Sequence, residues 1–116
     1  MANARRGEIA ARFDGAEYTL CLTLGALAEL EQALGAGDLT QLVERFSSGR
    51  LSATDLVTII AAGLRGAGHE VTRAEVERMR SDDGVAGFAD AASRLLEAAF
   101  GAASTGEGAT ANPPTP

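Results

Sequence analysis

The chain has 116 residues, 46% hydrophobic and 22% charged, which is long enough and apolar enough for one small globular domain. Its ten Arg, absence of Lys, and sixteen Asp plus Glu give a net charge of −6, which argues against general binding to nucleic acid. The single Cys21 excludes an intrachain disulfide, and no segment has the apolar length of a signal peptide or a membrane span, so we expect a cytoplasmic protein that binds no membrane.

After a flexible N-terminus over residues 1–7, the sequence predicts a β-hairpin over residues 8–22. Asp14-Gly15 is the dipeptide that best tolerates the positive φ values of a two-residue turn. This turn pairs Phe13 with Ala16, and the larger apolar side chains then share one face: Ile9, Ala11, Phe13, Tyr18 and Leu20. Because two strands alone are marginally stable, we expect helices to cover that face.

Two short helices are predicted next, over residues 24–34 and 38–47. Thr23 can cap the first helix, which carries a leucine stripe and ends at Gly35. Asp38 can cap the second helix, with Gln41 three residues later. Each of the two helices therefore has a predicted capping residue at its start, and the first also has a glycine at its end.

A third helix is predicted over residues 52–65, and Ser52 with Asp55 opens it. Its large apolar residues share one face. A second surface of small residues would let another helix approach closely; it consists of Ala61, Ala62 and Gly63. The glycines that follow residue 65 end this helix.

A fourth helix is predicted over residues 72–81, starting at a capping box of Thr72 and Glu75, and its polar body indicates a surface position. The last predicted helix, over residues 84–100, is capped by Asp82 or Asp83 and has the broadest apolar stripe in the chain.

Residues 102–116 contain no large apolar side chain and all three Pro, so we expect a disordered tail. The predicted fold is α+β, mainly α: an N-terminal β-hairpin packed on about five short helices, in a single globular domain over residues 8–101.

No pattern in the chain indicates catalysis. A P-loop needs Lys, and the glycine-rich run over residues 63–68 follows a helix rather than a strand, which favours a helix end over a dinucleotide site. The only histidine, His69, stands in a glycine-rich turn next to Glu70, and nothing in the sequence outlines a catalytic or metal site around it. We therefore expect no catalytic residue, no cofactor, no metal and no enzymatic activity.

Several stretches of the chain match one known family in order and spacing. The most telling are residues 22–31, which read LTLGALAELE, and residues 61–69, which read AAGLRGAGH; others are Arg6-Gly7-Glu8 and Arg45-Phe46. The chain resembles the small protein encoded among the tail genes of gene transfer agents and related tailed phages. That family is usually described as a tail assembly chaperone, and its members are sometimes labelled tail tube proteins.

The resemblance implies that the protein binds the tape measure protein during tail assembly and keeps it soluble until tube subunits polymerise around it. A structural, tube-associated component of the particle is the alternative, although a tube lining usually demands more extended β-structure than one hairpin. An unassigned small binding module is the third possibility.

Binding of this kind would bury apolar helical stripes of the two partners against each other. The candidate partner-binding residues come from the last predicted helix and from the small-residue surface: Phe88, Leu95, Leu96, Phe100, Ala61, Ala62 and Gly63. Each of these residues can instead belong to the core of the domain, as most apolar helical stripes do. Such stripes also promote self-association, so we include a homo-oligomer among the expectations.

Overall fold

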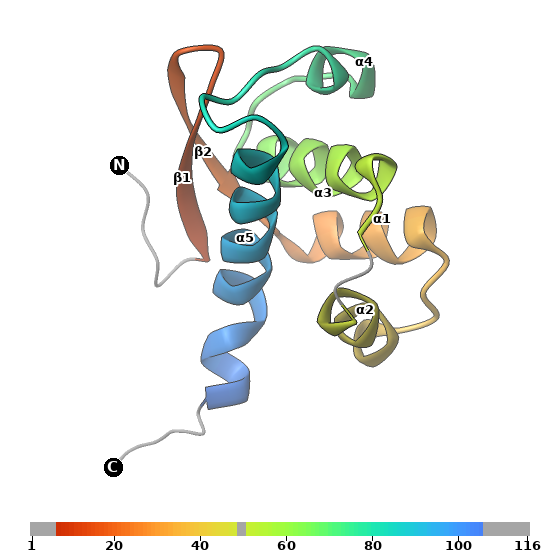
Figure 1. The fold of residues 1–116 in the computed structure, drawn as a ribbon. Coiled ribbons are helices and arrows are strands. Elements are labelled where there is room, and N and C mark those ends of the chain that lie inside the picture. The colour runs from red at the N-terminus through yellow and green to blue at the C-terminus, as the bar shows by residue number, and fades with distance from the viewer. Residues whose placement is uncertain (1–6, 49–50, 106–116) are drawn as a thin grey trace.

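The computed structural model describes residues 7–48 and 51–105. These residues form two strands and five helices (Figure 1), namely β1 (Glu8–Phe13), β2 (Ala16–Cys21), α1 (Leu24–Leu34), α2 (Leu39–Ser47), α3 (Ala53–Gly66), α4 (Arg73–Glu77) and α5 (Val85–Thr105). The described fold is therefore α+β and mainly α, as predicted. The N-terminus expected to be flexible, apart from Gly7, and residues 106–116 of the expected tail lie outside the described residues.

The hairpin has the predicted register. β1 and β2 are antiparallel, and Phe13 pairs with Ala16 across the turn. Asp14 and Gly15 have φ values of +56° and +77°, the left-handed conformations that a tight two-residue turn requires. Four side chains of the apolar face are buried and form one side of the core: Ile9, Ala11, Phe13 and Leu20.

Helix α3 is the central element of the described fold. Figure 1 shows it with α4 above it and α1 below it, and it also contacts β2 and α5. Every residue of α3 from Thr58 to Leu64 is buried. A helix that is apolar on nearly all sides in this way must be covered by several neighbours, which is why the other elements pack around it.

Local capping explains where four helices begin. The side chains of Thr23, Asp38, Ser52 and Thr72 each accept a hydrogen bond from a backbone N–H in the first turn of the helix that follows. Gly35, with a φ of +72°, ends α1. The predicted starts of α1 to α4 are therefore confirmed.

The predicted end of α4 is wrong. α4 ends at Glu77 rather than at residue 81, because the chain turns there to reach the hairpin. The Asp14 N–H donates to the Arg80 carbonyl at 2.7 Å, and the Arg80 N–H donates to Asp14 Oδ1 at 3.0 Å. These two bonds replace the helical bonds that a longer α4 would make.

Helix α5 also differs from its prediction at both ends. It begins at Val85 after Gly84, whose φ is +65°, so the residue before the helix is a glycine rather than Asp82 or Asp83. It continues to Thr105, beyond the predicted end at residue 100 and into the segment expected to be disordered. Residues 102–105 read AAST and include no proline, so nothing in this sequence stops the helix.

Candidate functional site

Five of the seven predicted partner-binding residues are buried in the core. They are Ala61, Ala62, Gly63, Leu95 and Leu96. A side chain buried by its own domain contacts no partner while the fold is intact, apart from the edge of Leu96, which is 8% exposed. The other two residues, Phe88 and Phe100, are half-buried on α5.

The small-residue surface of α3 packs against another helix of the same domain. A Cβ built on Gly63 would lie 2.5 Å from Leu95 Cδ2 on α5 and 3.3 Å from Leu20 Cβ on β2. The predicted close approach of a helix is therefore made by α5, which packs against α3 in the core.

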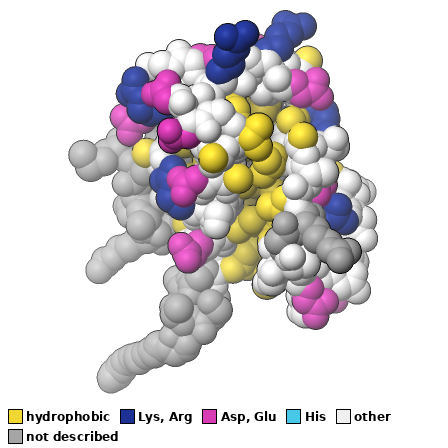
Figure 2. Space-filling view, viewed as in Figure 1, with side chains coloured by type: hydrophobic (Ala, Val, Ile, Leu, Met, Phe, Trp, Pro, Cys, Tyr) yellow, Lys and Arg dark blue, Asp and Glu magenta, His cyan; other side chains and the backbone are white. Residues whose placement is uncertain are grey.

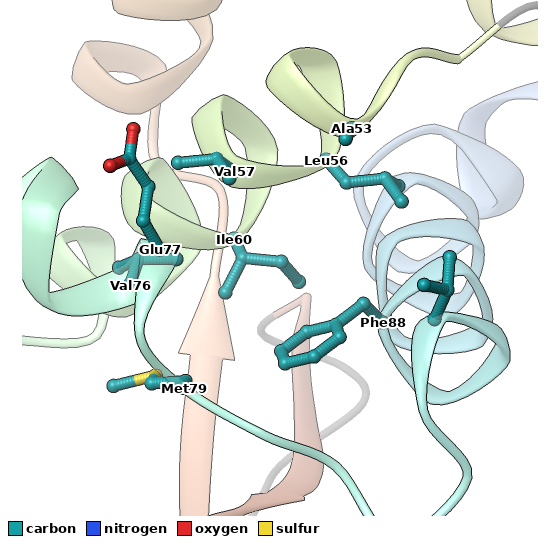
Figure 3. A pocket seen from close by; sticks show the side chains of 9 residues that line it. Ala53, Leu56, Val57, Ile60, Val76, Glu77, Met79 and Phe88 are labelled. Carbon is teal, nitrogen blue, oxygen red and sulfur yellow. The ribbon is translucent and has the colours of Figure 1, made fainter.

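An apolar cavity opens between α3, α4 and the start of α5. This first cavity has a volume of about 210 Å³. Its apolar lining includes Leu56, Val57, Ile60, Val76, Met79, Val85 and Phe88. Figure 3 shows the lining side chains that it labels converging from α3, α4, α5 and the segment after α4, with the Phe88 ring reaching from α5 toward Ile60 on α3.

Phe88 joins this cavity to the core. Its ring stacks on the buried ring of Phe13, with centroids 5.0 Å apart and an interplanar angle of 13°. Stacking fixes the ring from the hairpin side, while the half-buried remainder of Phe88 lines the first cavity. Contacts within the domain therefore hold the Phe88 side of the cavity wall in place.

A second apolar cavity lies farther along α5, where the helix faces α2. It has a volume of about 270 Å³. Its apolar lining consists of Val43, Phe46, Leu51, Leu96 and Phe100. Two of the seven predicted residues, Leu96 and Phe100, thus line this cavity, and Phe88 lines the first.

The two cavities share no lining residue but lie along the same side of α5, and together we call them the α5 groove. Val85, Phe88, Leu96 and Phe100 lie within one face of α5 by helical geometry, and they line one cavity or the other. Figure 2 shows hydrophobic side chains gathered in a strip down this face of the molecule. Between Val85 and Phe100 the helix rises about 22 Å, which is roughly four turns.

The charged residues that line the groove are acidic. Glu77 lines the first cavity and Glu97 lines the second, and no Arg is among the residues that line either one. Glu77 is 54% exposed and lies 3.6 Å from Arg73 in an i,i+4 pair. Glu97 is exposed and has no ion-pair partner within the part of the chain that the structure describes.

An ion pair positions α2, one wall of the second cavity. Arg45 Nη2 lies 3.2 Å from both carboxylate oxygens of Asp55, and Arg45 Nη1 donates to the Leu34 carbonyl at 3.0 Å. Asp55, which is 6% exposed, also accepts the Ser52 N–H in the capping box of α3. The sequence predicted that Ser52 with Asp55 opens α3, but no signal in it indicated that Arg45 would reach Asp55.

The glycine-rich run and His69 take part in the packing of the fold. The glycine-rich run ends α3, and the His69 ring packs edge-on against Tyr18 with centroids 5.4 Å apart. Over residues 7–48 and 51–105, no group of three His, Cys, Asp or Glu could hold a metal ion. None of the helices described over these residues is both long enough and apolar enough to cross a membrane.

Comparison with known proteins identified one family. A family model described as "Phage tail tube protein, GTA-gp10" matches residues 6–102. The match covers both strands, α1 to α4, most of α5, and every residue that lines the α5 groove. No significant match was found among curated proteins or solved structures.

Proposed function

Because the chain belongs to the phage tail tube protein family GTA-gp10, we propose that it is a structural, tube-associated component of the tail of a gene transfer agent or phage-like particle. The observation that carries this proposal is the family match over residues 6–102, which spans nearly the whole described fold. Membership of a tail family also makes other tail proteins the expected class of partner.

The proposed mode of action is non-enzymatic binding. The α5 groove offers an apolar surface along about four helical turns, and hydrophobic burial provides roughly 25 cal/mol per Å² of apolar area removed from water. Phe88 and Phe100, at opposite ends of the groove, are the half-buried aromatic anchors on α5. A tail protein that covers the groove would need no chemistry beyond complementary shape and charge.

A second candidate function is that of a tail assembly chaperone for the tape measure protein, acting in the cytoplasm of the producing cell. The specific observation in its favour is the architecture, because the described residues contain one two-stranded sheet and are otherwise helical or loop. A continuous β-sheet lining for a tube would need further strands, whereas a helical domain with an apolar groove suits binding to a long helical client.

Two measurements on the same producing cells separate these functions. Finished particles are purified and the chain is quantified by mass spectrometry, while the tagged chain is purified from cell extract and its bound proteins are identified. Stoichiometric presence in particles supports the tail component. Binding to the tape measure protein in cells, together with absence from particles, would support the chaperone and overturn the structural role.

A further inference from the structure

We infer that the α5 groove binds one amphipathic helix of another protein, with an apolar stripe flanked by Lys or Arg side chains. The inference rests on the proposed function only for the expectation that the helix belongs to a tail protein. That the groove binds a helix with basic flanking residues is inferred from the shape, lining and charge of the groove.

The lining of the groove favours a helix over an extended strand. Both cavities are walled by side chains projecting from helices, together with Leu51 and Met79 from connecting segments, and no strand residue is among those that line them. An extended segment laid in such a groove would lose water from backbone N–H and C=O groups without gaining a β-ladder. A helix satisfies these groups internally, and its side chains can pack as ridges between those of α5 and those of α2 and α3.

The positions of the exposed hydrophobic side chains also indicate that a partner covers the groove. Four large hydrophobic residues are exposed in the described chain, and two of them line the groove: Val85, 73% exposed, at the first cavity, and Val43, 37% exposed, at the second. They stand near opposite ends of the α5 groove, where a bound helix of about four turns would cover both. The other two, Leu24 and Leu39, line neither cavity.

The acidic side chains at the groove favour basic residues beside the apolar stripe of the bound helix. Glu97, which has no ion-pair partner among the described residues, lies at the second cavity, and Glu77, which shares its charge with Arg73 at 3.6 Å, lies at the first. A helix with Lys or Arg beside its apolar stripe would therefore meet a carboxylate at each cavity, with the stronger attraction at Glu97. A second copy of this chain fits less well, because each copy carries a net charge of −6 and would bring acidic surface to an acidic groove.

The test uses designed 18-residue peptides with Leu at helical stripe spacing. One peptide has Lys beside the stripe, one has Glu at the same positions, and one is a scrambled form of the Lys peptide. Binding to the full chain is measured by fluorescence anisotropy at low salt, and induced helicity by circular dichroism. We expect the Lys peptide to bind at least tenfold more tightly than the other two and to become helical.

A matched pair of double variants locates the site. Val43→Ser with Val85→Ser should weaken binding of the Lys peptide at least tenfold, whereas Leu24→Ser with Leu39→Ser should leave it within twofold. Glu77→Gln with Glu97→Gln should reduce the preference for Lys over Glu peptides severalfold. All four hydrophobic sites are exposed, so the variants should keep the melting temperature of the unaltered chain.

Several outcomes would overturn the inference. These are equal effects of the two serine double variants, equal binding of the Lys and Glu peptides, or absence of binding by the unaltered chain. Light scattering that shows a dimer abolished by Val43→Ser with Val85→Ser would assign the groove to a second copy instead. None of these results bears on whether the chain is found in particles, so the tail role and the groove assignment can fail separately.

Discussion

Gly66, the last residue of α3, lies directly against the backbone carbonyl of Cys21, the last residue of β2. A Cβ built on Gly66 would overlap that carbonyl oxygen. The glycine-rich run over residues 63–68, which the sequence predicted as a helix end, is thus also the place where α3 and the hairpin meet. Because a backbone carbonyl cannot rotate away as a side chain does, only glycine allows this approach.

We predict that Gly66→Ala destabilises the domain. Overpacking of a core contact costs about 1–3 kcal/mol, and the cost here lies toward the upper end because the collision is with backbone. The control is Gly25→Ala in α1, where the nearest atom to the new Cβ, Thr23 Oγ1, is at an ordinary 3.8 Å. Thermal unfolding by circular dichroism should show a lower melting temperature for Gly66→Ala and an unchanged or higher one for Gly25→Ala. Equal melting temperatures would contradict the close approach.

We predict that Arg45→Ala lowers the free energy of unfolding by about 1–3 kcal/mol, because the nearly buried Asp55 carboxylate loses its cationic partner. The Arg45 side chain is 42% exposed, so solvent screens this pair and the cost stays below that of a fully buried ion pair. Urea unfolding measures the change. Arg78→Ala, at an exposed arginine just after α4, is the control and should change stability by less than about 0.5 kcal/mol. Similar effects of the two substitutions would show that the pair does not stabilise the fold.

The elements that could be predicted from the sequence are those with local determinants. Asp14-Gly15 fixes the hairpin register within two residues, and the side chains of Ser52 and Thr72 satisfy backbone N–H groups in the next turn. The end of α4 could not be predicted in this way, because it depends on hydrogen bonds between Arg80 and Asp14, which lie 66 residues apart in the chain.

The groove was only partly predictable for a similar reason. The apolar stripe of α5 was visible in the sequence, but a stripe does not show which side of it the domain itself covers. The structure divides the stripe between Leu95, which faces Gly63 in the core, and Phe88 and Phe100, which line the groove. The walls contributed by α2 and α4 come from distant segments, so no local pattern identified them.

Because Leu95 is buried in the core, substituting it tests the stability of the fold and not partner binding. Leu95 is 0% exposed, so Leu95→Glu places a carboxylate among apolar side chains and should unfold the domain rather than remove a partner contact. Far-ultraviolet circular dichroism should show loss of helical signal at 25 °C. Ala89→Glu, at an exposed position of the same helix, should keep the helical signal. A folded Leu95→Glu variant would mean that the α3–α5 contact is not part of the core.

The final prediction concerns α4, the shortest helix and one wall of the first cavity. With only five residues, α4 depends on its capping box, in which Thr72 Oγ1 accepts the Glu75 N–H at 3.1 Å and Glu75 Oε1 accepts the Thr72 N–H at 2.7 Å. Loss of a threonine cap costs about 0.5–2 kcal/mol, enough to open α4 locally. Thr72→Ala should therefore increase hydrogen exchange in α4.

The same substitution should leave exchange in α3 and α5 nearly unchanged, because the core contacts of these helices do not include Thr72. It should also weaken binding of the Lys-flanked peptide by severalfold, since Val76 and Met79 would no longer be held against the first cavity. Thr40→Ala, at an exposed position in α2 outside both cavities, is the control and should preserve peptide affinity. Unchanged affinity of Thr72→Ala despite faster exchange in α4 would show that this helix is not a wall of the binding site.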